Sequence, residues 1–168
     1  QAEVANRAAA GEDMAALGDA LDWEDSGWPD FDLYAPVFAA ALETGARIYG
    51  AAVPRETVRA AFDSGPADVF GQDAERFGLT RPLPGDEQAT REAEQMSAHC
   101  DALPEDMLPG MVDAQRLRDA AFARVALAAL EETGGPVAVV TGNGHARTDW
   151  GMPVPLARAA PEVAVLSF

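Results

Sequence analysis

The sequence contains no lysine, one cysteine and two histidines in 168 residues, so all 12 basic residues are arginine. The absence of lysine excludes Schiff-base chemistry and a phosphate-binding loop of the usual lysine-containing type. Cys100 has no second cysteine with which to form an internal disulfide or a CxxC redox or zinc motif.

Long apolar runs are also absent, since none reaches the roughly 18 residues that a membrane-spanning helix needs. The chain opens Gln1-Ala2-Glu3-Val4, with no methionine, charged leader or lipid-attachment cysteine near its start. We expect it to be the interior of a longer protein.

Negative charge dominates the composition. Aspartate and glutamate total 28, and the formal net charge is −16. Because nucleic-acid affinity comes largely from basic side chains that neutralise phosphates, nucleic acid is excluded as a partner. Hydrophobic residues make up 48%, enough for a packed core. We predict a single domain over residues 1–168, forming the C-terminal part of a longer domain.

Apolar residues recur at helical spacing through most of the chain. Met14, Leu17 and Leu21 mark one core-facing stripe. The spacing predicts helices over residues 1–10, 12–22, 31–43, 54–62, 86–100, 105–133 and 153–158. On the longest of these, which we expect to bend near Pro109-Gly110, the predicted buried side consists of Leu117, Ala121, Val125 and Ala128. Residues 63–86 are rich in glycine and proline and predict a surface excursion with one helical turn.

Three short apolar segments, 46–53, 137–141 and 163–166, predict strands. The second is a β-branched run, typical of a strand covered on both faces of a parallel sheet. Strands that alternate with helices predict an α/β fold, a parallel sheet flanked by helices. Because three strands are few for this much helix, we expect the N-terminal strands of the sheet to be missing from this chain.

The segment Gly142-Asn143-Gly144-His145-Ala146-Arg147-Thr148-Asp149 directly follows the second predicted strand. Loops at the carboxyl ends of strands carry functional groups in open α/β sheets. The glycines allow a tight turn that presents His145, with Arg147 as an anion-binding group. The alternative is a glycine turn with a structural histidine. The glycine spacing does not match a dinucleotide fingerprint.

His99-Cys100 ends the predicted helix 86–100, where the helix dipole alone stabilises a histidine cation. His99 could equally ligate a metal or haem iron, with Met96, Met107 and Met111 nearby in sequence. No HxxH or HExxH spacing exists, and we assign no other metal ligands.

Gln115, Arg118, Asp119 and Phe122 share one face of the long helix, at i, i+3, i+4 and i+7. This face is either solvated or directed toward His145. Tyr34 and Tyr49 are the only phenols. A phenolate can bind haem iron, whereas core packing is the default for Tyr34. The tryptophan- and proline-containing loop 23–36 could also form an interface patch.

Three groups of motifs together resemble a known family. They are Trp28-Pro29 with Tyr34 and Pro36; His99-Cys100 with Gln115-x-x-Arg118-Asp119; and Gly142-Asn143-Gly144-His145-Ala146-Arg147 with Gly151-Met152-Pro153. In this order and spacing they resemble the ChaN-like haem-binding uptake proteins, of one superfamily with Tiki proteases and erythromycin esterases. The family's two opening strands, which end in Gly-Glu-x-His and Phe-Glu-Met, have no counterpart in this chain.

The resemblance implies an α/β fold and a haem-binding protein of bacterial iron uptake, with haem at a homodimer interface. It implies that Gln115, Arg118, Asp119 and His145 line the superfamily pocket, and that Tyr34, His99, His145 and Arg147 are haem-side candidates. It also implies a cell-envelope location, as an outer-membrane lipoprotein or in the periplasm. Membrane attachment would then use only a lipid anchor outside this chain.

Two alternatives stay open. One is a hydrolase of the Tiki or erythromycin-esterase type with His145 as general base, which also needs the missing Glu and His motifs. The other is an interaction domain that uses the tryptophan loop. Because those motifs are missing, a binding protein is favoured over an enzyme.

Overall fold

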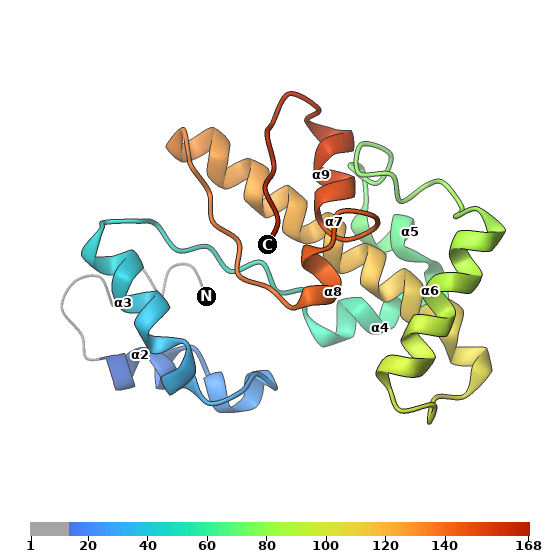
Figure 1. The fold of residues 1–168 in the computed structure, drawn as a ribbon, viewed down its shortest axis with the longest axis horizontal. Coiled ribbons are helices and arrows are strands. Elements are labelled where there is room, and N and C mark those ends of the chain that lie inside the picture. Colours follow the sequence, from blue (N-terminus) through green and yellow to red (C-terminus); the bar gives the residue numbers. More distant parts are fainter. Residues whose placement is uncertain (1–13) are drawn as a thin grey trace. The chain divides into compact units, whose positions relative to one another are not determined.

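The computed structural model describes residues 14–168, and these form helices joined by turns and extended segments (Figure 1). The chain divides into two compact units, residues 1–50 and 51–168. The predicted helix over residues 1–10 lies outside the described residues. No helix between residues 14 and 168 combines the length and the apolar character needed to cross a bilayer.

The described part of the first unit, residues 14–50, contains two α-helices and two 3-10 turns. These are α2 (Met14–Ala20), η1 (Trp23–Ser26), η2 (Phe31–Leu33) and α3 (Ala35–Glu43). Trp23 is the centre of an aromatic cluster, because its indole lies 5.1–5.9 Å, between ring centroids, from Trp28, Phe31, Tyr34 and Phe38. Its Nε1 also donates a hydrogen bond to the Pro29 carbonyl at 2.8 Å. The predicted tryptophan loop is therefore ordered by ring packing.

The second unit is a set of helices around one long central helix. It comprises α4 (Arg55–Ser64), α5 (Pro66–Phe70), α6 (Gly85–Ala98), η3 (Glu105–Met107), α7 (Leu108–Thr133), α8 (Asn143–Ala146) and α9 (Pro153–Ala159). Helix α7 contacts α4, α5, α6 and α9 (Figure 1). The predicted helices 54–62, 86–100, 105–133 and 153–158 and the single turn within 63–86 are confirmed, with boundaries shifted by a few residues.

Local signals explain where α7 begins and ends. Pro109 stands in its first turn, where a missing N–H costs nothing, and Gly134 ends it in the left-handed region at φ 77°. The predicted bend near Pro109 does not interrupt the helix. Gly110 instead allows α4 to approach closely, since a Cβ there would lie 2.3 Å from the Phe62 ring.

The core lies along α7. Leu117 and Ala121 are buried as predicted, whereas Val125 is half-buried and Ala128 is exposed. The remaining core side chains come from α4, the end of α5, the turn after α5, the middle of α7, and α9 with its flanking residues: Ala61, Phe70, Ala74, Phe77, Leu79, Ala120, Ala123, Ala126, Leu127, Met152, Leu156 and Ala160.

The prediction of a parallel sheet is wrong, because residues 14–168 contain no strand. Segments 46–53, 137–141 and 163–166 are extended, but they form no ladder with one another. Val139 and Val140 are 41% and 61% exposed rather than covered on both faces. A β-branched run favours extended backbone, whereas pairing depends on a neighbouring strand, and the described chain supplies none. Residues 14–168 are therefore helical and do not form the expected α/β architecture.

Candidate functional site

The turn that carries His145 forms α8 and is tied to the segment that follows it. The amide of Met152 donates to the His145 carbonyl at 2.8 Å, and the amide of Gly151 donates to the Arg147 carbonyl at 3.1 Å. A Cβ on Gly151 would lie 2.4 Å from the first of these carbonyl oxygens and 2.6 Å from the second. Only glycine permits this approach, which holds the His145 backbone against the segment that leads into α9.

His145 of α8 pairs with Asp119 of α7. The imidazole Nδ1 lies 2.7 Å from Asp119 Oδ1, and the Phe122 ring meets the imidazole edge-on at 5.0 Å between centroids. Because the carboxylate accepts the Nδ1 proton, the Nε2 lone pair is left to take a proton or bind a metal. This arrangement is chemically suited to a general base or to an oriented ligand.

Asp119 is almost fully enclosed, with 1% of its surface exposed. Burial raises the pKa of its carboxyl above the ordinary value, and the hydrogen bond from His145 offsets that rise in part. Its second oxygen, Oδ2, is buried without a hydrogen-bond partner. An unsatisfied buried carboxylate oxygen is costly and requires an explanation.

A chain of amide groups connects this pair to His99. Gln115 Nε2 donates to the Gly144 carbonyl at 3.0 Å, and Gln95 Nε2 donates to Gln115 Oε1 at 2.6 Å. His99 Nδ1 in turn donates to the Gln95 carbonyl at 2.7 Å. The structure therefore brings Gln115, Asp119, His99 and His145 into one connected network, and His99 is exposed with its Nε2 unused.

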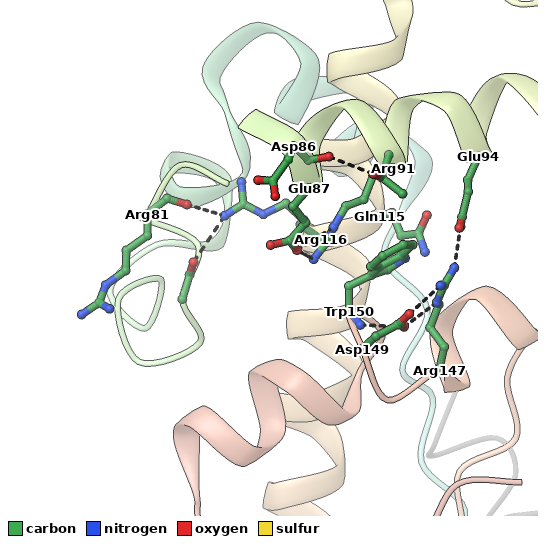
Figure 2. A network of polar contacts seen from close by, with 12 residues as sticks. Arg81, Asp86, Glu87, Arg91, Glu94, Gln115, Arg116, Arg147, Asp149 and Trp150 are labelled. Atoms are coloured by element: carbon green, nitrogen blue, oxygen red, sulfur yellow. Dashed lines mark hydrogen bonds and ion pairs between the residues drawn. The ribbon is translucent and has the colours of Figure 1, made fainter. Parts of the chain in front are cut away.

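Arg147 is fully engaged by its neighbours (Figure 2). Its Nε and Nη2 each lie 2.6 Å from an Asp149 carboxylate oxygen, its Nη1 pairs with Glu94, and its guanidinium lies 3.6 Å from the Trp150 ring centroid. The hydrogen bonds from Arg147 lower the pKa of Asp149. Each of the three guanidinium nitrogens of Arg147 thus already donates to a carboxylate.

Two further predicted site residues lie apart from this network. Tyr34 packs in the aromatic cluster of the first unit. Arg118 is next to Asp119 in sequence, but successive helical side chains point about 100° apart, and it lines a different hollow. Burial lowers the pKa of Arg118.

That hollow, which we call the α4–α7 groove, has a volume of about 510 Å³. Three arginines, Arg55, Arg59 and Arg118, surround an apolar floor made by Val58, Phe62 and Met107, with Asp63 as the one acidic neighbour. Within residues 14–168 none of the three arginines has a hydrogen-bond or ion-pair partner. The groove is open, since Phe62 is 38% and Met107 is 40% exposed.

A second hollow of about 200 Å³, the arginine pocket, lies between α6, α7, α9 and the turn before α6. Its polar wall is formed by Arg81, Arg91, Arg116, Arg158, Glu87 and Asp119, and Trp150 lies beside them. Figure 2 shows Arg116 reaching the Arg81 carbonyl, at 2.7 Å, while Arg91 pairs with Glu87. Asp119 thus joins the histidine network to this pocket.

Comparison with known families is decisive for the chain's membership. The sequence profile of the family described as "Haem-binding uptake, Tiki superfamily, ChaN" matches residues 1–156. The chain belongs to this family. No curated protein and no solved structure matches it. The resemblance carried by the three groups of motifs is therefore confirmed, and the ChaN-like family description names haem-binding uptake.

For a ChaN-like protein the expected ligand is haem, and the types of residue that line the α4–α7 groove suit haem. The groove combines an apolar floor, cationic side chains and a thioether. In the described part of the chain, no three His, Cys, Asp or Glu side chains come close enough together to hold a metal ion.

The sequence did not lead us to predict the α4–α7 groove or the contacts of Gln95 and Trp150. Arg55 and Arg59 stand at i, i+4 on an amphipathic helix, and Gln95 and His99 repeat that spacing on α6. Both pairs could therefore be recognised in the sequence by their spacing. That Met107 and Arg118 face α4 depends on helix packing, which no local spacing reveals.

Proposed function

We propose that this chain binds haem in the α4–α7 groove. The observation that carries the proposal is a hollow with three unpartnered arginines and an apolar floor, in a chain of net charge −16. A haem presents an apolar macrocycle and two carboxylates. The groove volume of about 510 Å³ falls in the range of roughly 300–1,000 Å³ usual for small-molecule pockets.

The arginines supply the partners for the haem carboxylates. Guanidinium and carboxylate groups form bidentate, charge-assisted hydrogen bonds. Arg118 gains most, because burial disfavours its charged form and an anionic ligand would compensate that loss. Val58 and Phe62 offer apolar contact to the macrocycle.

Met107 is the groove residue best suited to ligate iron, because thioethers serve as axial ligands in cytochromes. His99 is the second candidate, since its Nδ1 is held by Gln95 and its exposed Nε2 is unused. Tyr34, the phenol of the aromatic cluster in the first unit, is kept as the phenolate candidate that the family resemblance implies. Bound haem would supply a redox-active iron that the chain itself lacks.

We further propose that haem recruits a second copy of the chain. The open side of the groove leaves Phe62 and Met107 exposed, and a haem seated there would keep one edge in water. A second copy would cover that edge. Sedimentation velocity tests this: haemin should convert monomer into dimer, and a haem-loaded monomer would contradict it.

Family membership also supports a place in the cell envelope, as an outer-membrane lipoprotein or in the periplasm. Fractionation of the source cells tests this, with recovery in the envelope fraction as the expected result.

A haemin titration of the purified chain tests the groove. We expect a saturable Soret band, and Arg59→Gln and Arg118→Gln should each weaken binding about tenfold, as loss of a charge-assisted hydrogen bond implies. Arg76→Gln is the matched control, because Arg76 is exposed and lies outside both hollows. Unsaturable binding, or equal losses in all three variants, would contradict the proposal.

The axial ligand is tested by the same titration. Met107→Leu preserves volume and removes the iron-binding sulfur, so its spectrum should shift while an apolar contact remains. His99→Ala and Tyr34→Phe are run alongside. A shift in either of these variants, with none in Met107→Leu, would assign the iron to that residue and overturn the assignment to Met107.

A further inference from the structure

The arginine pocket is rich in positively charged side chains, although the chain as a whole is acidic. The whole chain carries 28 carboxylates against 12 arginines, yet this one hollow gathers four arginines against Glu87 and Asp119. At a volume of about 200 Å³ it is smaller than a usual drug-sized site, and it lies on the α6–α9 side of α7 rather than in the groove. It therefore suits a small anion and not a macrocycle.

The four arginines are not equivalent. Arg116 donates hydrogen bonds to Asp113 and to the carbonyls of Gly78 and Arg81. It therefore adds positive electrostatic potential to the pocket rather than hydrogen bonds to a ligand. Arg91 is 7% exposed and gives its Nε and Nη2 to Glu87. It keeps Nη1 unshared.

Arg81 and Arg158 are exposed and have no side-chain polar partner among residues 14–168. The stem of Arg158 lies against Gly78, where a Cβ would be 2.9 Å from Arg158 Cδ and where φ is +79°. A glycine in the left-handed region thus makes room for this arginine at the pocket. Both arginines are among the residues that line the hollow, and two uncommitted guanidinium groups can hold two carboxylates or a phosphate.

One acidic residue of the pocket wall, Asp119, lacks a hydrogen-bond donor for one of its oxygens. Asp119 is 1% exposed, its Oδ1 is taken by His145, and its Oδ2 has no partner. A ligand made only of anionic groups would leave this oxygen unsatisfied and would repel it. A hydroxyl on the ligand would satisfy it with a short, charge-assisted hydrogen bond.

We propose that the arginine pocket binds a small hydroxylated polycarboxylate, with its carboxylates on Arg81 and Arg158 and its hydroxyl donating to Asp119. The Trp150 indole forms the flat apolar side of the site, and Arg91 lies over that ring at 5.2 Å from its centroid. This site is separate from the proposed haem groove.

Isothermal titration with citrate and with tricarballylate, which lacks only the hydroxyl, tests the proposal. We expect citrate to bind at least about tenfold more tightly, because tricarballylate leaves Asp119 unsatisfied. Arg81→Gln and Arg158→Gln should each weaken citrate binding about tenfold, whereas Arg76→Gln, with the same change in net charge, should not. Asp119→Asn should remove the preference for citrate.

Equal affinities for citrate and tricarballylate, or equal losses in Arg76→Gln and Arg158→Gln, would overturn the proposal. No citrate binding would also overturn it. Haemin titration of Arg81→Gln and Arg158→Gln separates the two sites, since both variants should bind haemin as the parent does. Circular dichroism of each variant shows that the helices are retained.

Discussion

The Asp119–His145 pair is the most constrained feature of the molecule at the scale of single residues. The carboxyl of Asp119 is buried and its pKa is raised. Its Oδ1 lies 2.7 Å from the His145 Nδ1, whereas its Oδ2 has no hydrogen-bond partner. Such a pair loses stability when its carboxylate ionises, because burial disfavours the charged form. The cost is retained where the charge orients a neighbouring group, here His145.

Asp119→Asn should change the pH dependence of stability. The folded-state pKa of Asp119 is raised, although His145, Arg91 and Arg118 all act to lower it. The folded protein therefore holds this proton more tightly, and stability is lost as pH rises from about 3.9 through the raised value. Asparagine cannot ionise, so the free energy of unfolding of the variant should rise relative to the parent across that window, measured by urea denaturation.

Asp149→Asn is the control of opposite sign. Hydrogen bonds from Arg147 lower the pKa of Asp149, so its ionised form contributes stability above the ordinary pKa and loses it as pH falls. This variant should lose stability relative to the parent as pH rises. Parallel pH profiles for both variants would contradict the assignment.

Residue-scale expectations from the sequence were partly met. The i, i+4 spacing placed Gln115 and Asp119 on one face, and both do meet the His145 turn. Arg118 does not, because it lies about a quarter turn from Asp119 on α7 and faces α4. Which of the two neighbours faces the histidine depends on how α7 is rotated in its packing.

At the scale of elements, α7 organises the second unit through small side chains. Six buried alanines lie along it: Ala114, Ala120, Ala121, Ala123, Ala126 and Ala129. Small side chains let neighbouring helices approach closely, and interaxial distance follows side-chain size. Leu117 is one of the larger residues buried on α7, with 2% exposure, together with Leu108, Val112 and Leu127.

Leu117→Ala and Leu166→Ala compare the same change at two elements. Leu117 is in the core, so its truncation should cost about 2–5 kcal/mol of unfolding free energy. Leu166 is 83% exposed in the C-terminal extended segment, and its truncation should cost less than about 0.5 kcal/mol. Urea denaturation followed by circular dichroism measures both. Similar large losses would mean that residues 163–166 are buried as a strand.

The extended segments show why the sheet prediction failed. Val163 and Val165 pack against the core while Leu166 does not, so the period-two pattern of residues 163–166 is present without a pairing strand. Side-chain alternation specifies which face is buried, but a ladder also needs a second backbone at hydrogen-bonding distance. Ser167 instead hydrogen-bonds through its hydroxyl to the Ala146 carbonyl.

At the scale of the whole molecule, charge is distributed unevenly. Seven of the 12 arginines line the two hollows: Arg55, Arg59, Arg81, Arg91, Arg116, Arg118 and Arg158. Among residues 14–168, only the carboxylate side chains of Asp63, Glu87 and Asp119 line these hollows, out of 28 in the whole chain. An acidic protein with two cationic hollows attracts anionic ligands only locally.

Stability should rise with moderate salt. At net charge −16 the folded state brings like charges together, and screening weakens that repulsion. The melting temperature should therefore increase from low to physiological ionic strength, by the same amount in sodium and potassium chloride. A falling melting temperature would mean that pairs such as Arg147–Glu94 outweigh the general repulsion.

By itself, the sequence determined the helices, the acidic character, the family motifs and the turn that carries His145, because each depends on local spacing or composition. Tertiary structure alone decided that the apolar segments do not pair, that Asp119 is buried beside His145, and that arginines distant in sequence line two hollows. Such features arise where separate helices meet around α7. Contacts between segments that are distant in the sequence produce no periodic pattern of residues, so the sequence alone does not reveal them.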